Sequence, residues 1–365
     1  MDVIYRCPLD RISGYAAAGR EYVNALLYGG INVKVSLFNS LEDPALLSPE
    51  EKSYFISLSD KIVSSDATVI HNMVPDFWQR YPGGKNIGFM YWETDGFPSM
   101  WINYLKLVDK FWVCWEETKR ALMSVGISED KINLVPPVVN NNVFSPNIEP
   151  MKLETGKGFN FMTLFQLTYR KGFEVLLKAY LEEFDTDEDV CLVVKSYLQN
   201  SSIDNQNALK DWMRKFKMTV DKKVYPKIVF RGDIIANNVF PNFLRFADAF
   251  VLSTRGEGLG LPILQSMACG IPTITTGWGA QAQFVNNDNG WLIDYTKVNV
   301  SRMPHSPAYE FNQKWAEPNK DHLRSLMREA FENRDKVKEK GKAARKAVED
   351  NYSYEKVSKI LVGSL

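Results

Sequence analysis

Short apolar runs alternate with amphipathic segments along the first part of the chain. Apolar runs that are typical of buried strands occur at residues 3–7, 32–38, 67–71, 86–91, 111–114 and 132–135. Segments with helical periodicity lie between them, at residues 13–28, 100–107 and 117–125. Strands that alternate with helices in this way predict a parallel sheet wrapped by helices.

Prolines and asparagines at residues 136–146 interrupt this alternation and indicate a linker. A second block of apolar runs follows, at residues 159–165, 190–194, 227–230, 249–252 and 272–275. We therefore expect an α/β protein with two doubly wound, Rossmann-like domains, residues 1–145 and 146–350, and a final helix over residues 351–365. In such folds ligands bind where the carboxyl ends of the strands face a cleft.

The composition supports two globular cores and disfavours nucleic acid as a partner. The 365 residues are 45% hydrophobic, and 44 basic side chains balance 44 acidic ones. Lysines at residues 334–345 alternate with Asp335 and Glu339, which favours a solvated helix face over a membrane-surface patch. No apolar run is long enough to span a bilayer, so we expect at most peripheral membrane contact.

Cysteine and histidine usage argues against disulfides and metal sites. The four cysteines have no CxxC spacing and lie mostly in apolar stretches, which favours reduced thiols and a cytoplasmic location. The three histidines, His71, His305 and His322, are far apart and show no metal-ligand spacing. We expect no metal and no cofactor.

The most informative segment spans residues 255–272, where a glycine loop opens into a short helix. Glycines allow a tight turn and a close approach to a ligand, and Pro262 suits the first helical position. Gly270 is expected to end the helix. The unpaired amides at the helix start would face a phosphate or diphosphate, and they belong to Gly258, Leu259, Gly260 and Leu261. The alternative is a plain helix entry with a capping carboxylate.

This loop resembles the signature of retaining nucleotide-sugar glycosyltransferases of the GT-B fold, family 4, also called glycosyl transferases group 1. The resemblance covers essentially the whole chain. Glu257 matches a glutamate that holds hydroxyls of the donor sugar in the family. Gln265 stands where the family usually has a glutamate that grips the donor ribose, and an amide keeps the hydrogen bonds without the charge-assisted part. We expect weaker donor binding or an altered nucleotide preference.

A second cluster of candidate residues follows the strand at residues 159–165. Lys171 and Gly172 match the family's lysine-glycine pair, whose lysine neutralises the donor phosphates. Gln166 replaces the family's companion arginine, and Arg170 is the candidate to supply the missing charge. The alternative is a pair of surface cations near a helix end.

Three further segments lie at predicted strand ends and are candidates for donor binding. Lys195 can pair with phosphate and Tyr197 can stack on the nucleobase, although a polar strand exit explains both equally well. Arg231 opens a loop that matches the family's base-contacting loop. Gly14, between the first strand and first helix, lets the main chain approach the donor, or simply forms a turn.

Residues 90–98 are expected to face the same cleft. Many family members have a histidine there, whereas this chain has Glu93 and Asp95, either of which can hold a sugar hydroxyl or orient the acceptor. Trp92 can cover the apolar face of a sugar ring. The alternative is a helix N-cap by Asp95 with core aromatics. His71 also borders the predicted cleft, where a structural role competes with a functional one.

By resemblance, the chain is expected to transfer a sugar from a UDP- or GDP-linked donor to a hydroxyl of a glycan, lipid or other small acceptor, without a metal. Lys171, Arg170, Glu257 and Glu93 are the candidate catalytic residues. Two alternatives stay open, a non-catalytic subunit that binds sugar nucleotides and a nucleotide-sugar epimerase of similar architecture. Acceptor choice is expected in the loops at residues 39–52 and 72–84, and residues 297–314 form an unassigned loop.

Overall fold

The computed structural model describes residues 1–9, 13–36, 47–197, 202–301, 303 and 306–365. Its first domain holds a six-stranded parallel sheet in the order β2-β1-β3-β4-β5-β6. The strands are β1 Asp2–Arg6, β2 Asn32–Ser36, β3 Thr68–Asn72, β4 Asn86–Phe89, β5 Lys110–Val113 and β6 Ile132–Leu134. The helices are α1 Gly14–Tyr28, α2 Pro49–Ser59 and α3 Glu116–Ser124, with 3-10 turns at η1 Pro75–Phe77, η2 Ser99–Leu107 and η3 Glu129–Lys131.

The second domain repeats the architecture with a six-stranded parallel sheet in the order β12-β11-β10-β7-β8-β9. Its strands are β7 Phe159–Gln166, β8 Val190–Tyr197, β9 Lys227–Arg231, β10 Ala249–Leu252, β11 Thr273–Thr276 and β12 Gly290–Ile293. Its helices are α4 Phe173–Glu183, α5 Ile203–Lys217, α6 Phe240–Arg245, α7 Leu261–Ala268 and α8 Lys320–Glu332, with 3-10 turns at η4 Tyr169–Lys171 and η5 Ala280–Gln283. The prediction of two doubly wound parallel sheets is confirmed.

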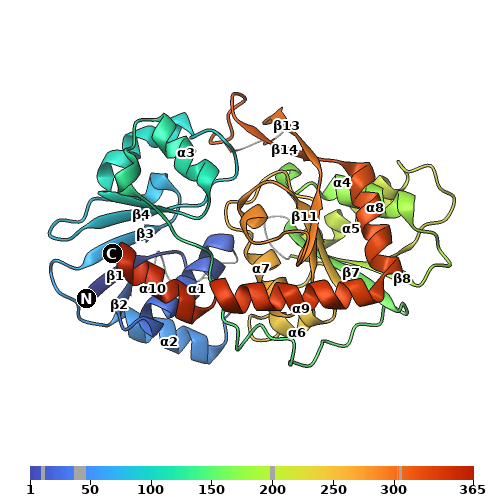
Figure 1. The fold of residues 1–365 in the computed structure, drawn as a ribbon, viewed down its shortest axis with the longest axis horizontal. Helices are drawn as coiled ribbons and strands as arrows, with labels where there is room; N and C mark the ends of the chain where they lie inside the picture. The colour runs from blue at the N-terminus through green and yellow to red at the C-terminus, as the bar shows by residue number, and fades with distance from the viewer. Residues whose placement is uncertain (10–12, 37–46, 198–201, 302, 304–305) are drawn as a thin grey trace.

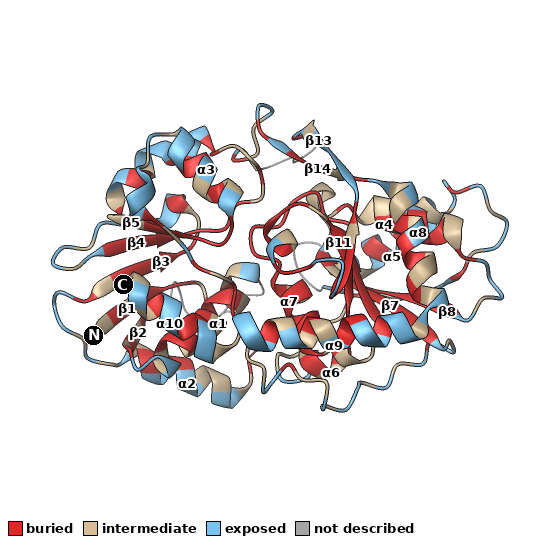
Figure 2. Ribbon diagram, viewed as in Figure 1, coloured by how far each residue is buried: buried red, intermediate tan, exposed pale blue. Residues whose placement is uncertain are grey.

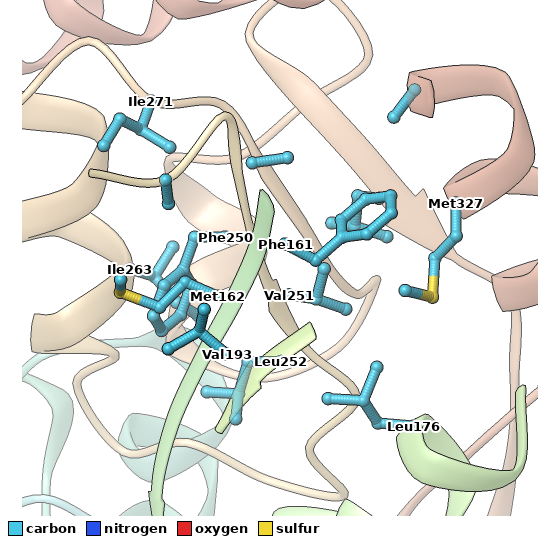
Figure 3. Packing of buried hydrophobic residues seen from close by; sticks show 14 of the residues in the cluster. Phe161, Met162, Leu176, Val193, Phe250, Val251, Leu252, Ile263, Ile271 and Met327 are labelled. Atoms are coloured by element: carbon cyan, nitrogen blue, oxygen red, sulfur yellow. The ribbon is translucent and has the colours of Figure 1, made fainter. Parts of the chain in front are cut away.

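Helices cover both faces of the second sheet, so its central strands read as continuous apolar runs (Figure 2). Successive residues of β10 point to opposite faces. Phe250 points toward Ile263 of α7, whereas Val251 points toward the side of Met327 on α8 (Figure 3). Sheet and helices thereby share one core, which holds the carboxyl ends of the strands in fixed positions.

The last two helices connect the domains. Helix α9, Arg334–Asn351, packs along the second domain against α7, and α10, Tyr354–Ser364, lies on α1 of the first domain (Figure 1). Val357 and Leu361 of α10 are fully buried in the same cluster as Leu26 of α1. The end of the chain therefore contributes to the core of the first domain.

A two-stranded antiparallel hairpin stands between β12 and α8. Its strands are β13 Tyr295–Asn299 and β14 Lys314–Pro318, and Figure 1 shows it beside the space between the domains. The sequence left most of this segment unassigned, because the residues of β13 are largely exposed and lack a clear alternation of apolar and polar positions.

Two sequence expectations differ from the structure in detail. The segment expected as a helix over residues 100–107 is the 3-10 helix η2, and the helix α2 was not predicted. Residues 37–38 of the second predicted strand, residues 39–46 of a predicted acceptor loop, and His305 lie outside the described residues. Within the described residues, none of the helices has both the length and the apolar character required to cross a membrane.

Glu21 of α1 lies against α10 and makes the junction between the two sensitive to pH. Its Oε2 accepts a hydrogen bond of 2.7 Å from the Tyr354 hydroxyl. Burial raises the pKa of Glu21 to about 7, although the bond from Tyr354 opposes the shift. An unfolded glutamate has a pKa of about 4.3, so the stability that Glu21 contributes is complete below about pH 4 and is lost as the pH rises through about 7.

We therefore expect Glu21→Gln to raise the Tm relative to the wild type at pH 8 and to change it little at pH 5. Thermal unfolding at both pH values measures the difference. Glu355→Gln, on the exposed side of α10, serves as the control because its carboxylate pairs with Lys359 on the surface. An equal effect of Glu21→Gln at the two pH values would refute the assignment.

Candidate functional site

Two cations and a carboxylate meet where β7 and β10 end. Lys171 Nζ lies 2.5 Å from Glu257 Oε1, and Arg170 Nη1 lies 3.4 Å from the same oxygen. The Thr254 hydroxyl donates to this oxygen as well, at 3.1 Å. Arg170 and Lys171 come from the turn η4 after β7, whereas Glu257 follows β10, so neighbouring parallel strands bring them together. Thr254 was not predicted.

Burial and pairing together set the charge state of this cluster. Burial disfavours the charged form of Glu257, but Lys171 and Arg170 outweigh it, and the pKa of Glu257 lies below its ordinary value. Burial lowers the pKa of Lys171, and the nearby Glu257 carboxylate opposes that shift. The site is therefore partly desolvated, and it contains a carboxylate and two cations that stabilise each other's charge.

The first domain contributes a second carboxylate to the same cluster. Glu93, in the segment after β4, has its Oε1 3.3 Å from Arg170 Nη2. Its other oxygen, Oε2, accepts a hydrogen bond of 3.1 Å from the hydroxyl of Tyr309, in the connection between β13 and β14. The structure thus brings together all four residues predicted to be catalytic and adds Tyr309, for which the sequence carries no signal.

The glycine loop enters α7 as a left-handed turn. Gly260 is the N-cap residue and has φ of 75°, a conformation that favours glycine. Leu261 is the first helical residue, so Pro262 occupies the second position and not the first as predicted. Gly270 has φ of 74° just after the helix, as expected for a C-terminal cap. Pro262 has no amide hydrogen, and the Ile263 amide already donates to the Gly260 carbonyl at 3.0 Å, so the amides that could face an anion are those of Gly258 to Leu261.

The same loop packs against the first domain. A Cβ on Gly256 would lie 2.2 Å from the carbonyl oxygen of Glu93, and one on Gly258 would lie 2.8 Å from the amide nitrogen of Trp92. Leu259 and Leu261 are buried in the hydrophobic cluster of the first domain. These glycines therefore serve the close approach of two main chains, a role that the sequence did not reveal.

Gly256→Ala is expected to force the two domains apart at this point, because the atom in the way belongs to main chain and cannot rotate aside. We predict a larger radius of gyration by small-angle scattering and a loss of nucleotide binding. Gly363→Ala, in α10, is the matched control, since a Cβ there meets no atom within 4 Å. An unchanged radius of gyration together with unchanged binding would show that the contact has no such role.

Arg255, directly before the loop, is a buried arginine that was not predicted. Its guanidinium makes a two-point contact with Glu317 of β14, at 2.6 and 2.7 Å, and lies 2.6 Å from Glu174 of α4. It also lies over the ring of Tyr169, 3.7 Å from the centroid. Burial opposes the charge of Arg255, but these carboxylates raise its pKa. Arg255 therefore links the loop, η4 and the hairpin.

The predicted base-side residues lie at the ends of β8 and β9. Lys195 is buried 6.0 Å from the Tyr197 ring, and burial, helped by Arg231, lowers its pKa to about 8. Arg231 is held by Asp233 through two bonds of 2.8 and 2.6 Å. Burial raises the pKa of Tyr197, and the Glu257 carboxylate adds to this rise while the Arg170 guanidinium opposes it.

The remaining donor candidates occupy helix starts. Gln265 is buried in the second turn of α7. Gly14 is the first residue of α1, where the Ser13 hydroxyl accepts a bond from the Ala16 amide and caps the helix.

The four buried cysteines are all free thiols.

Three residues of the first domain that were predicted to border the acceptor side of the cleft have different surroundings. His71 is fully buried between Arg6, at 2.9 Å, and Asn86, at 3.3 Å, and burial lowers its pKa to about 4. Asp95 accepts a bond of 2.7 Å from the Lys314 amide and so holds the hairpin. Trp92 packs against Trp101 and Tyr309. None of the three is brought into contact with Glu257 among the described residues.

Other features of the surface do not coincide with this cluster. Among the described residues, no group of three or more His, Cys, Asp or Glu side chains is arranged to hold a metal ion. A hollow of about 690 Å³ lies between β12 and helices α8 and α9, and its lining includes Trp291, His322, Lys336 and Lys340.

Comparison with known proteins connects this architecture to a class of fold. HepE of Anabaena, solved with UDP and glucose, matches 100% of this chain and 99% of its own, with a TM-score of 0.70 and 12% identity. Sucrose-phosphate synthase of Thermosynechococcus elongatus matches 100% of this chain and 98% of its own, with a TM-score of 0.67 and 12% identity. The two facing parallel-sheet domains are those of the GT-B fold.

Sequence comparison adds a family match and two curated relatives. Residues 159–300 match the family described as glycosyl transferases group 1. Mannosylfructose-phosphate synthase of Agrobacterium fabrum is 27% identical over 163 residues, which are 41% of this chain and 34% of that protein. D-inositol 3-phosphate glycosyltransferase of Paenarthrobacter aurescens is 24% identical over 185 residues, 49% of this chain and 43% of that protein. The alignments thus span less than half of these relatives. Residues 159–300, which lie mostly in the second domain, thus match the glycosyl transferases group 1 family, and the whole chain shares the GT-B fold.

Proposed function

We propose that this protein is a retaining glycosyltransferase that moves a sugar from a UDP- or GDP-linked donor to an acceptor hydroxyl of a glycan, lipid or other small molecule. The observation that carries the proposal is the contact of Lys171 and Arg170 with Glu257, at the entry to α7. The family match over residues 159–300 and the UDP in the solved HepE complex support a nucleotide-sugar donor.

In the proposed reaction, these residues stabilise the leaving group. As the bond between the sugar carbon and the phosphate oxygen breaks, negative charge grows on the diphosphate. Lys171, Arg170 and the amides of residues 258–261 offset that charge in a partly desolvated site, where such interactions are strongest. When the donor binds, Glu257 releases Lys171 and accepts hydrogen bonds from hydroxyls of the sugar. These bonds fix the sugar ring before the glycosidic bond breaks.

The acceptor oxygen forms the new bond on the same face of the sugar, and the departing phosphate oxygen takes the acceptor proton. This step requires no metal and no separate base, because the phosphate oxygen receives the acceptor proton. Closure of the two domains excludes water and limits hydrolysis of the donor. On the base side, Tyr197 stacks on the nucleobase and Lys195 faces phosphate.

The second candidate function is a non-catalytic subunit that binds sugar nucleotides. It is favoured by Gln166 and Gln265, which stand where the family has an arginine and a glutamate. The epimerase alternative gains no support from the comparisons, because the matching family and the two curated relatives are described as transferases or synthases.

Thermal stabilisation and nucleotide release with a panel of UDP-, GDP- and ADP-sugars, first without metal and then with it, test the proposal. We expect one UDP- or GDP-sugar to raise the Tm and to release its nucleotide slowly without metal. Stabilisation without turnover, even with acceptor extracts, would favour the binding subunit. A lack of stabilisation by every nucleotide sugar would contradict both functions.

A further inference from the structure

The cluster around Arg170 is electrically balanced before any donor arrives. Arg170 and Lys171 carry two positive charges, while Glu257 and Glu93 carry two negative ones, and all four side chains are at most 17% exposed. A balanced cluster attracts a diphosphate weakly, because its cations already have partners. Donor binding therefore requires that at least one carboxylate give up its cation.

The contacts of Arg170 show which carboxylate is easier to displace. Within the second domain, its Nη1 donates to the carbonyl of Gly256 at 2.5 Å and lies near Glu257. Across the domain boundary, its Nη2 lies 3.3 Å from Glu93 Oε1, and the Tyr309 hydroxyl is a further neighbour of the guanidinium. Moving the domains apart would break the contact with Glu93 and leave those with Gly256 and Glu257 in place. The pairing with Glu93 is thus the one that depends on closure.

Tyr309 provides the displaced carboxylate with a second partner. Glu93 uses Oε1 for Arg170 and Oε2 for the Tyr309 hydroxyl, so loss of Arg170 leaves one bond intact. The connection that carries Tyr309 is tied to the first domain as well, since Gln313 accepts from Thr94 and Glu310 accepts from Ser99. Glu93 and Tyr309 therefore stay together when Arg170 turns away.

We propose that Glu93 is a counter-ion that holds Arg170 until the donor diphosphate takes its place, and that Tyr309 is a positioning residue that retains Glu93 during the exchange. The proposal rests on the proposed function, in which Arg170 binds the donor diphosphate. It gives Glu93 a role in setting donor affinity, in place of the contact with a sugar hydroxyl expected from the sequence.

Calorimetric titration of the full-length protein with UDP, GDP, UMP and GMP tests the exchange. Glu93→Gln keeps the shape and the bonding atoms of the side chain but removes its charge. We expect it to bind the preferred diphosphate about fivefold more tightly than the wild type, the upper range for a partly exposed ion pair. The monophosphate, which lacks the second phosphate that displaces Glu93, should bind equally to both proteins.

Tyr309→Phe separates positioning from a merely structural role. In the wild-type background we expect about threefold weaker diphosphate binding, because displaced Glu93 loses its remaining partner. In the Glu93→Gln background the same change should have little effect, since Tyr309 acts through the charge of Glu93. Equal effects in both backgrounds would overturn the role of Tyr309.

Glu129→Gln is the matched control for the loss of one carboxylate. Glu129 is an exposed residue of the first domain that pairs with Lys119, so its replacement should leave diphosphate affinity unchanged. Equal or weaker diphosphate binding by Glu93→Gln would overturn the counter-ion proposal alone. A failure of both the wild type and Glu93→Gln to bind any nucleoside diphosphate would overturn the proposed function and this inference with it.

Discussion

Replacement of Lys171 by alanine is expected to lower the rate of sugar transfer by about 100-fold or more, with little loss of stability. Lys171 is the nearest cation to Glu257 and lies where the proposed leaving group develops charge. After the replacement Glu257 keeps its contacts with Arg170 and Thr254, so the fold retains partners for the buried carboxylate. Initial rates at saturating donor measure the effect.

The control for this prediction is Lys178→Ala, on α4. Lys178 is half exposed and lies 3.8 Å from Glu182 on the surface, so its removal should leave the rate unchanged. If Lys171→Ala turned over at the wild-type rate with saturating donor, Lys171 would have no part in the mechanism.

Arg255→Ala is expected to cost about 3 kcal/mol of stability, the largest structural effect of a single substitution around the site. The change removes a buried guanidinium and leaves Glu174 and Glu317 without their shared cation. Both carboxylates keep some exposure to solvent, which holds the cost to the lower end of the range for buried ion pairs. Chemical denaturation and the Tm measure the loss, which should amount to roughly 5 °C or more.

Arg255→Lys distinguishes charge from geometry. Lysine keeps the positive charge but cannot make the two-point contact with Glu317, so an intermediate loss is expected. The triple variant Arg255→Met, Glu174→Gln, Glu317→Gln should recover part of the stability, because no buried charge is left unpaired. A triple variant less stable than Arg255→Ala would contradict the electrostatic origin of the loss.

The parts of the molecule that were predictable depend on local patterns. Apolar runs near residues 159–165 and 249–252 predicted strands, and the glycines before Pro262 predicted the entry to α7. Lys171 and Glu257 were recognised because they lie at strand ends in a known arrangement. Such features are set by neighbours within a few residues, so a single sequence carries them.

The parts that were missed depend on contacts between distant segments. Tyr309 lies 216 residues from Glu93 and reaches it only because the hairpin lies beside the first domain. Gly256 and Gly258 looked like ligand-facing glycines, but the clash a Cβ would make is with the main chain of Glu93 and Trp92. His71 was predicted to border the cleft, but in the structure it is buried and hydrogen-bonded to Arg6.

Hydrogen exchange with and without the preferred nucleotide sugar tests the location of the donor site most directly. Binding at the proposed site should slow exchange of amides at residues 166–172 and 256–262, which flank Lys171 and form the glycine loop. If only amides near Trp291 and Lys340 were protected, the ligand would bind in the hollow between β12 and helices α8 and α9. That result would contradict the proposed site.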